Sequence, residues 1–214
     1  MIYRFTTATL LAQGAAAGRQ LQLSCNTGQV ATCFANNGSG MVITLVPGTM
    51  SSWDGLEADT QLSLWNKYAS IACSEEGGVC VWQGANPKRV VKIKDNFGTT
   101  TLEGLTIKEG DNPGEYGGGL YVHNSNVVLI IVAFIDNATS YGGAIYVVTT
   151  GSSTVTLQGC SFAGNTAAGS APDVYNYGQT VVIGGCPTGE DKPRLRPDSD
   201  QTHSSLPPIC PLPN

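Results

Sequence analysis

Charged residues are scarce in this chain. They make up 13% of its 214 residues, against roughly 25% in an average soluble domain. The 11 basic residues form no long run, whereas a protein that binds nucleic acid needs a basic stripe to displace phosphate counterions. The sequence also has no apolar run of about 18 residues, the length that a membrane-spanning helix requires. We therefore expect neither nucleic-acid binding nor a membrane span.

Metal-binding motifs are missing as well. No Cys-x-x-Cys pair occurs, and the two histidines, His123 and His203, lie far apart, which argues against a zinc site. His123 has no evident nucleophile partner, because Ser125 is too close in sequence to identify a catalytic triad. We expect His123 at the surface, and we expect no cofactor and no metal.

Seven cysteines are present, and six of them form close pairs along the chain. The spacing suggests three local disulfides, which would imply an oxidising compartment. Reduced cysteines in a cytosolic protein are the alternative. The expected pairs are Cys25 with Cys33, Cys73 with Cys80, and Cys186 with Cys210.

The first 17 residues have the features of a signal peptide. Arg4 supplies a charged start, Phe5 to Leu11 form a short apolar region, and Ala15 to Ala17 suit a cleavage site. An N-terminal helix that caps the fold is the alternative. Together with the cysteines, the signal peptide predicts an extracellular or cell-surface protein.

A repeat dominates the middle of the chain. The segments TLEGLTI (101–107), VLIIVAF (128–134) and TLQGCSF (156–162) align, and their leucines Leu102, Leu129 and Leu157 lie 27 and 28 residues apart. A second set consists of YGGGLYV (116–122), YGGAIYV (141–147) and the weaker APDVYNY (171–177). Short runs rich in Val, Ile, Thr and Tyr at this period are typical of the strands of a solenoid.

The repeat predicts an all-β fold, a right-handed parallel β-helix over residues 18–183 with five to six coils. Like residues in successive coils should stack into apolar columns. We expect an N-terminal cap and a polar, Pro-rich C-terminal tail over 184–214. Residues 51–66 fit the repeat poorly and are expected as an insertion loop or a short helix.

Several small and polar residues have structural interpretations. The pairs Gly117-Gly118 and Gly142-Gly143 precede a strand, which predicts tight corners with positive φ. Cys160 falls on the inward column of Leu105 and Val132, so we expect a buried free thiol there.

Two glycosylation sequons begin at Asn37 and Asn137. Asn37 is a candidate glycan site in a Gly-rich loop. Asn137 aligns with Asn165, and stacked asparagines at a coil corner form an inward hydrogen-bonded ladder. We favour the ladder for Asn137, because a buried Asn cannot carry a glycan.

The motif GGAI (Gly142–Ile145), together with FxxN at Phe134–Asn137 and Phe162–Asn165, resembles the repeats of the chlamydial polymorphic outer-membrane proteins. It also looks like the wider set of pectin-lyase-like β-helices. This resemblance implies the fold. It does not specify an activity, because the architecture carries lyases, hydrolases, epimerases, adhesins and inert spacers.

Lyases of the pectin-lyase-like kind need clustered carboxylates for calcium and a Lys or Arg. The resemblance therefore nominates Asp111, Glu115, Asp136 and Lys108 as the catalytic set if the protein is an enzyme. Solvated corner residues are the alternative interpretation. The paired aspartates and Gly-His-Gly of the related polygalacturonases are absent, as is the Asp-Pro-His of the alginate epimerases.

The expected function is accordingly a secreted or cell-surface β-helix module without catalytic residues, used in adhesion, a matrix or structural assembly. A calcium-assisted polysaccharide lyase is the alternative. The expected partners are a polysaccharide or a protein at the cell surface. Because a β-helix has open ends, end-to-end or partner-chain assembly is expected too.

Overall fold

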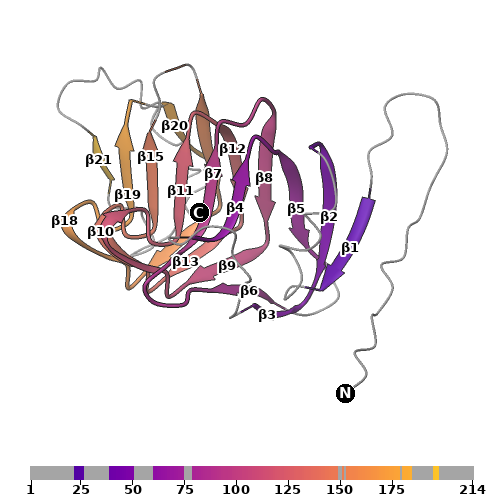
Figure 1. Cartoon of the computed structure of the whole chain (residues 1–214), viewed down its shortest axis with the longest axis horizontal. Coiled ribbons are helices and arrows are strands. Elements are labelled where there is room, and N and C mark those ends of the chain that lie inside the picture. Colours follow the sequence, from indigo (N-terminus) through magenta and orange to yellow (C-terminus); the bar gives the residue numbers. More distant parts are fainter. Residues whose placement is uncertain are drawn as a thin grey trace, which may run out of the picture.

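The computed structural model describes residues 22–26, 39–50, 60–74, 79–148, 151, 153–178, 180–184 and 195–197. All regular structure in these ranges is strand, and every pairing between strands is parallel. The strands stack coil upon coil into a β-solenoid (Figure 1), so the predicted fold class is confirmed.

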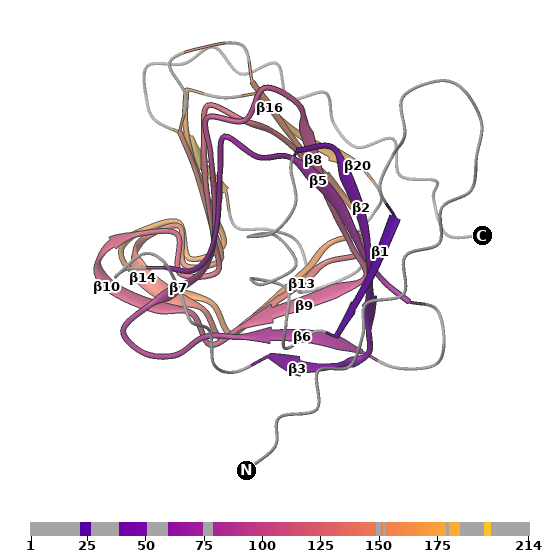
Figure 2. The same cartoon turned by 45° about the vertical axis from the view of Figure 1, so that its right-hand side comes forward.

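Three long sheets form the walls of the solenoid, and a fourth, shorter sheet projects from one corner (Figure 2). Sheet A comprises seven strands: β1 (Gln22–Asn26), β2 (Met41–Val46), β5 (Ala69–Cys73), β8 (Thr99–Glu103), β12 (Asn126–Ile130), β16 (Thr154–Gln158) and β20 (Thr180–Gly184). Sheet B comprises β3 (Gly48–Met50), β6 (Cys80–Gln83), β9 (Leu105–Lys108), β13 (Ala133–Ile135) and β17 (Ser161–Ala163).

Sheet C comprises β4 (Thr60–Trp65), β7 (Arg89–Lys94), β11 (Leu120–His123), β15 (Ile145–Val148), β19 (Val174–Tyr177) and β21 (Leu195–Pro197). Sheet D comprises β10 (Asp111–Tyr116), β14 (Ala138–Tyr141) and β18 (Thr166–Ser170). In the coils that contain sheet D, the chain passes from sheet A to B, then D, then C. The solenoid makes about four turns, slightly fewer than the five to six coils expected. The outermost strands β1 and β21 extend single sheets and close no further coil within the described residues.

The core is built from columns of like residues, one from each coil. Leu102, Leu129 and Leu157 pair in register on sheet A and are buried. On sheet B, Ile107 precedes Phe134 and Phe162, whose rings stack at 5.3 Å between centroids. No single coil could bury its apolar face alone, so stacking of neighbouring coils stabilises the fold.

In the two coils that carry the YGG motifs, glycine pairs form the corner between sheets D and C. Gly117 and Gly142 have φ values of +63° and +64°, a conformation that costs L-residues other than glycine. The next glycines are needed for close packing, since a methyl group at Gly118 or Gly143 would lie 2.4 or 2.3 Å from a backbone oxygen of a neighbouring segment. Both glycine pairs therefore sit at a tight corner.

Asparagines line the inside of the corner between sheets B and D. Nδ2 of Asn137 donates to the carbonyl oxygen of Ile107 and to Oδ1 of Asn165, each over 3.0 Å. Oδ1 of Asn137 accepts from the backbone N–H of Gly110. Asn165 repeats the pattern one coil on by donating to the carbonyl oxygen of Phe134. The two amides thus satisfy backbone groups that the turn leaves without a strand partner.

Residues 51–66 were expected to form an insertion loop or a short helix, and for residues 60–65 that expectation is wrong. Residues Thr60–Trp65 form β4, which pairs with β7 in sheet C. Leu62 and Leu64 alternate with Ser63 and Trp65 in a strand-like burial pattern. This alternation covers only six residues, too few to predict a strand from the sequence. Residues 51–59 lie outside the described ranges.

Candidate functional site

A column of tyrosines runs along the outer face of sheet C. Tyr121, Tyr146 and Tyr175 occupy equivalent positions of β11, β15 and β19 and pair in register. Their rings stack almost in parallel, with centroids 5.7 Å and 5.2 Å apart. The ring faces of the three tyrosines therefore cover one another.

Two tyrosines from sheet D close over this column. The ring of Tyr116 lies 4.6 Å from that of Tyr146, and the ring of Tyr141 meets Tyr175 edge-on at 5.5 Å. Tyr146 is consequently only 9% exposed although it is on the outside of the solenoid. The five rings form a small outer core that packs sheet D against sheet C.

Arg89 caps one end of the column. Its guanidinium carbon lies 4.8 Å from the ring centroid of Tyr121 in a cation–π contact. Nη1 of Arg89 donates to the carbonyl oxygen of Tyr116, and Nη2 lies 3.9 Å from the Glu115 carboxylate. The buried arginine therefore ties the first tyrosine of sheet C to the first strand of sheet D.

A second outward column on sheet C contains Trp65, Lys94, His123, Val148 and Tyr177, which are in register across β4, β7, β11, β15 and β19. Trp65 and Tyr177 are 56% and 49% exposed. The ammonium group of Lys94 lies 5.1 Å from the Trp65 ring centroid. Together the two columns and the rings of Tyr116 and Tyr141 make up what we call the aromatic face.

His123 is partly buried on this face. Its Nδ1 lies 2.9 Å from Oδ1 of Asp95, and its ring is parallel to that of Tyr121 at 6.4 Å. Nδ2 of Asn124 also donates to Oδ1 of Asp95, so the aspartate holds the histidine ring in place. The hydroxyl of Ser125 donates to the carbonyl oxygen of His123 and so turns inward, which leaves no nucleophile at the imidazole within this group.

Burial changes the acidity of the tyrosines. Desolvation raises the pKa of Tyr121 above its ordinary value of 10.0, partly offset by the Arg89 charge. Desolvation also raises the pKa of Tyr146, and the neighbouring phenols add to the shift. Both groups are therefore neutral hydrogen-bond donors at any physiological pH.

Three of the four residues nominated for a lyase contact separate partners. Nζ of Lys108 lies 2.9 Å from Glu109, Asp111 accepts a hydrogen bond from Asn86, and Glu115 faces Arg89. Asp136 is an exposed corner residue with φ +52°. No three His, Cys, Asp or Glu side chains in the described ranges come together in a group that could hold a metal ion. The structure therefore does not assemble Asp111, Glu115 and Asp136 into a calcium site.

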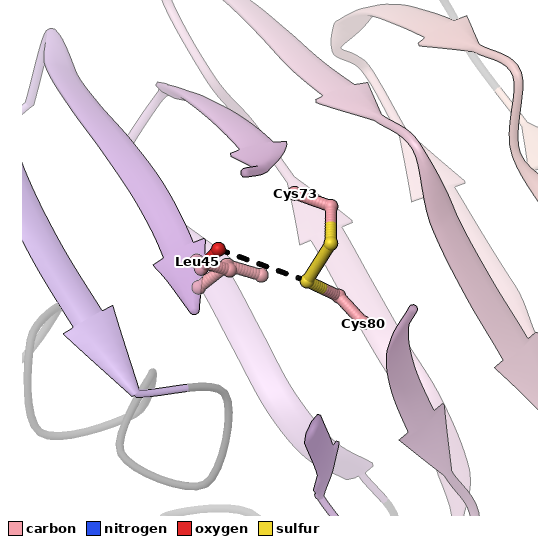
Figure 3. The surroundings of a disulfide bond; sticks show 3 residues. All are labelled: Leu45, Cys73 and Cys80. Atoms are coloured by element: carbon pink, nitrogen blue, oxygen red, sulfur yellow. Dashed lines mark hydrogen bonds between the residues drawn. A yellow bond between two sulfur atoms is a disulfide. The ribbon is translucent and has the colours of Figure 1, made fainter. Parts of the chain in front are cut away.

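Of the six paired cysteines, the structure describes one complete pair. Cys73 and Cys80 are joined by a disulfide that links the end of β5 to the start of β6 (Figure 3). The sulfur of Cys80 lies 3.8 Å from the carbonyl oxygen of Leu45 on β2. Cys25 is in β1, and Cys33, Cys186 and Cys210 lie outside the described residues.

Cys160 is a free, buried thiol. Its sulfur lies 3.5 Å from the carbonyl oxygen of Leu129, and burial raises the pKa of the thiol. A neutral thiol in this position acts as a small apolar side chain rather than as a nucleophile.

Several expectations concern residues outside the described ranges. These are the signal peptide over 1–17, the glycan site Asn37 and nearly all of the tail over 184–214. Asn137 is fully buried, so the folded structure has no room for a glycan on its side chain.

The aromatic face was not anticipated from the sequence, although a signal for it exists. Tyr121, Tyr146 and Tyr175 recur at the coil period, and Tyr116 and Tyr141 open the YGG motifs. The alternation within each strand predicts only that these tyrosines face outward, and it does not predict that their rings pack together.

Comparison with protein-family models, curated proteins and solved structures gave no match. In the described part of the chain, no helix has the length and apolar character needed to cross a membrane. The protein is therefore classified by its fold alone, as a parallel β-solenoid.

Proposed function

We propose that this protein is a secreted or cell-surface β-helix module that binds a linear polysaccharide in adhesion or in a matrix, without catalysing a reaction. The observation that carries the proposal is the registered column of Trp65, Lys94, His123, Val148 and Tyr177 on sheet C. Aromatic rings combined with a few polar groups are the usual composition of carbohydrate-contacting surfaces.

The geometry of the column favours a linear polymer. Neighbouring strands are about 4.8 Å apart, so the four strand spacings between Trp65 and Tyr177 cover roughly 19 Å along the solenoid axis. A chain lying along this axis would meet an exposed ring at each end and Lys94 and His123 between them. A protein ligand is the competing partner class, since exposed Trp and Tyr also suit protein interfaces.

The alternative function, a calcium-assisted polysaccharide lyase, has no comparable structural observation in its favour. A lyase of the kind that the sequence motifs resemble requires calcium held by several carboxylates. Asp111 and Glu115 have other partners, and no three His, Cys, Asp or Glu side chains in the described ranges come together. Lys108 pairs with the adjacent Glu109, and His123 pairs with Asp95 of the neighbouring coil. Such pairs hold side chains in fixed orientations on the surface.

Glycan-array screening of the mature protein, followed by titration calorimetry with the best polysaccharide, tests the proposal. We expect Trp65→Ala and Tyr177→Ala each to weaken binding about tenfold, the loss that an exposed aromatic anchor usually causes. Phe97→Ala is the matched control, because Phe97 is 93% exposed but lies beyond the end of β7. Failure to bind any polysaccharide, or equal losses in all three variants, would refute polysaccharide binding at this face. Capture of a protein that depends on Trp65 and Tyr177 would favour the competing class.

A further inference from the structure

Sheet A presents an outer face that differs from the aromatic face. Its middle outward column is in register from β2 to β20 and consists of Val42, Ser70, Thr101, Val128, Thr156 and Val182. Every one of these side chains is short, and five of the six are β-branched. None of the pairings within sheet A contains a bulge in the described residues. The result is an even surface without protruding rings.

The outer face of sheet A is also almost without charge. The chain has 27 charged residues, yet Glu103 is the one charged side chain among the described outward positions of this sheet. Sheets B and C carry lysines at outward positions, including Lys108 and Lys92. Val46 and Val182 on sheet A are 44% and 45% exposed, so apolar surface is in contact with solvent here.

We propose that a second copy of this chain covers the outer face of sheet A, so that the protein self-associates through face-to-face packing of two such sheets. Sheets pack about 10 Å apart when short β-branched side chains interdigitate, and sheet A supplies such side chains in a regular array. The chain has a net charge of −5, so two copies repel each other, and the nearly uncharged wall is where they can approach at least cost. This inference does not depend on polysaccharide binding, which we place on sheet C.

The size of the face predicts a weak association. Five strand spacings of about 4.8 Å and strands of about 16 Å give a footprint of roughly 400 Å². Stable interfaces bury about 800 Å² on each partner. We therefore expect a dissociation constant in the micromolar range or weaker, with association strengthened by salt, which screens the repulsion between the two acidic copies.

Sedimentation velocity of the full chain over a series of micromolar concentrations tests this inference. Val128→Arg places a charge at the centre of the face and should lower the association constant at least about tenfold, because a guanidinium buried without a partner is strongly unfavourable. Glu103→Gln removes the single charge and should strengthen association. Thr106→Arg changes the net charge by the same amount on the outer face of sheet B and should not weaken association, because it lowers the repulsion between the two acidic copies.

Circular dichroism of each variant confirms that it is folded before association is compared. A wild-type chain that stays monomeric at every concentration and salt level would overturn the proposal. Equal weakening by Val128→Arg and Thr106→Arg would overturn it too, because the effect would then not be specific to the face of sheet A. Polysaccharide binding measured on the same variants reports separately on sheet C, so the two proposals can fail independently.

Discussion

Asn137 and Asn165 lie one coil apart, and Nδ2 of Asn137 donates to Oδ1 of Asn165 inside the corner between sheets B and D. Asn137→Ala would leave the N–H of Gly110 and the carbonyl oxygen of Ile107 without their partner. Since each buried unsatisfied group costs about 1–3 kcal/mol, we expect a loss of roughly 2–3 kcal/mol in the free energy of unfolding. Denaturant titration measures it.

Asn126 provides the control for this substitution. Its Oδ1 accepts a hydrogen bond from the backbone N–H of Thr154, but the side chain is exposed, so water can replace the contact. Asn126→Ala should cost less than about 1 kcal/mol. Similar losses in the two variants would contradict the role assigned to the buried ladder.

Ile131 occupies an unfavourable backbone conformation. Its φ is +51°, and the corresponding corner residues of the adjacent coils are Gly104 and Gly159. A β-branched residue is strained there, and Ile131 is 66% exposed, so little burial is lost on removing it. We expect Ile131→Gly to raise stability by about 1 kcal/mol, which raises the melting temperature by roughly 2–4 °C. Ile130→Gly, within the preceding strand β12, should lower it instead.

Alanine substitutions at Gly142 and Gly114 distinguish the cost of backbone strain from the cost of steric crowding. Both have positive φ, but a methyl group at Gly142 would lie 2.3 Å from the carbonyl oxygen of Ile145, whereas a methyl group at Gly114 meets nothing within 4 Å. Gly114→Ala should cost about 1 kcal/mol for its conformation. Gly142→Ala should cost several times more because the corner must open. Thermal melts compare the two, and equal shifts would show that crowding has no part in the cost.

The tyrosine column predicts loss of stability in alkali. The pKa of Tyr146 is raised in the folded protein, so below pH 10 the phenol is neutral in both the folded and unfolded states and stability is unaffected. Above about pH 10 the unfolded chain ionises first, and the free energy of unfolding falls as the pH rises. Tyr146→Phe should flatten this decline between neutral pH and strong alkali, as followed by circular dichroism. An unchanged slope would argue against burial of the phenol.

The described cysteines should respond to reagents in two different ways. Reduction of the Cys73–Cys80 disulfide should destabilise the protein by roughly 2–3 kcal/mol. Cys160 should resist alkylation in the native state, because burial raises the pKa of its thiol. Denaturant titration with and without reductant measures the loss of stability, and peptide mapping after alkylation, with and without denaturant, measures the accessibility of Cys160. Rapid native labelling of Cys160 would show that the β-solenoid opens at this position.

The sequence predicted the solenoid because its core repeats. Leu102, Leu129 and Leu157 were aligned by their spacing, and they pair in register in the structure. The same is true of Leu120 and Ile145. Such columns can be recognised from one sequence because each coil has to bury the same inner surface.

Sheet D and the aromatic face could not be predicted in the same way. The strand Asp111–Tyr116 is polar, contains Pro113 and Gly114, and has the composition of a loop. It is a strand because β14 pairs with it from the next coil. Tyr116 of sheet D contacts Tyr146 of sheet C. The residue pattern within each strand cannot predict a contact between two different sheets.

The corners described above place a left-handed residue at the same point of successive coils, as Gly117, Gly142 and Ala171 illustrate. Each coil is thereby a module that starts and ends in the same orientation, and its stability depends mainly on its two neighbours. Insertion or removal of a whole coil would preserve every corner and lengthen or shorten the aromatic face and the face of sheet A by one strand spacing. The length of both faces along the solenoid axis is thus set by the number of coils, and it can change without any change within a single coil.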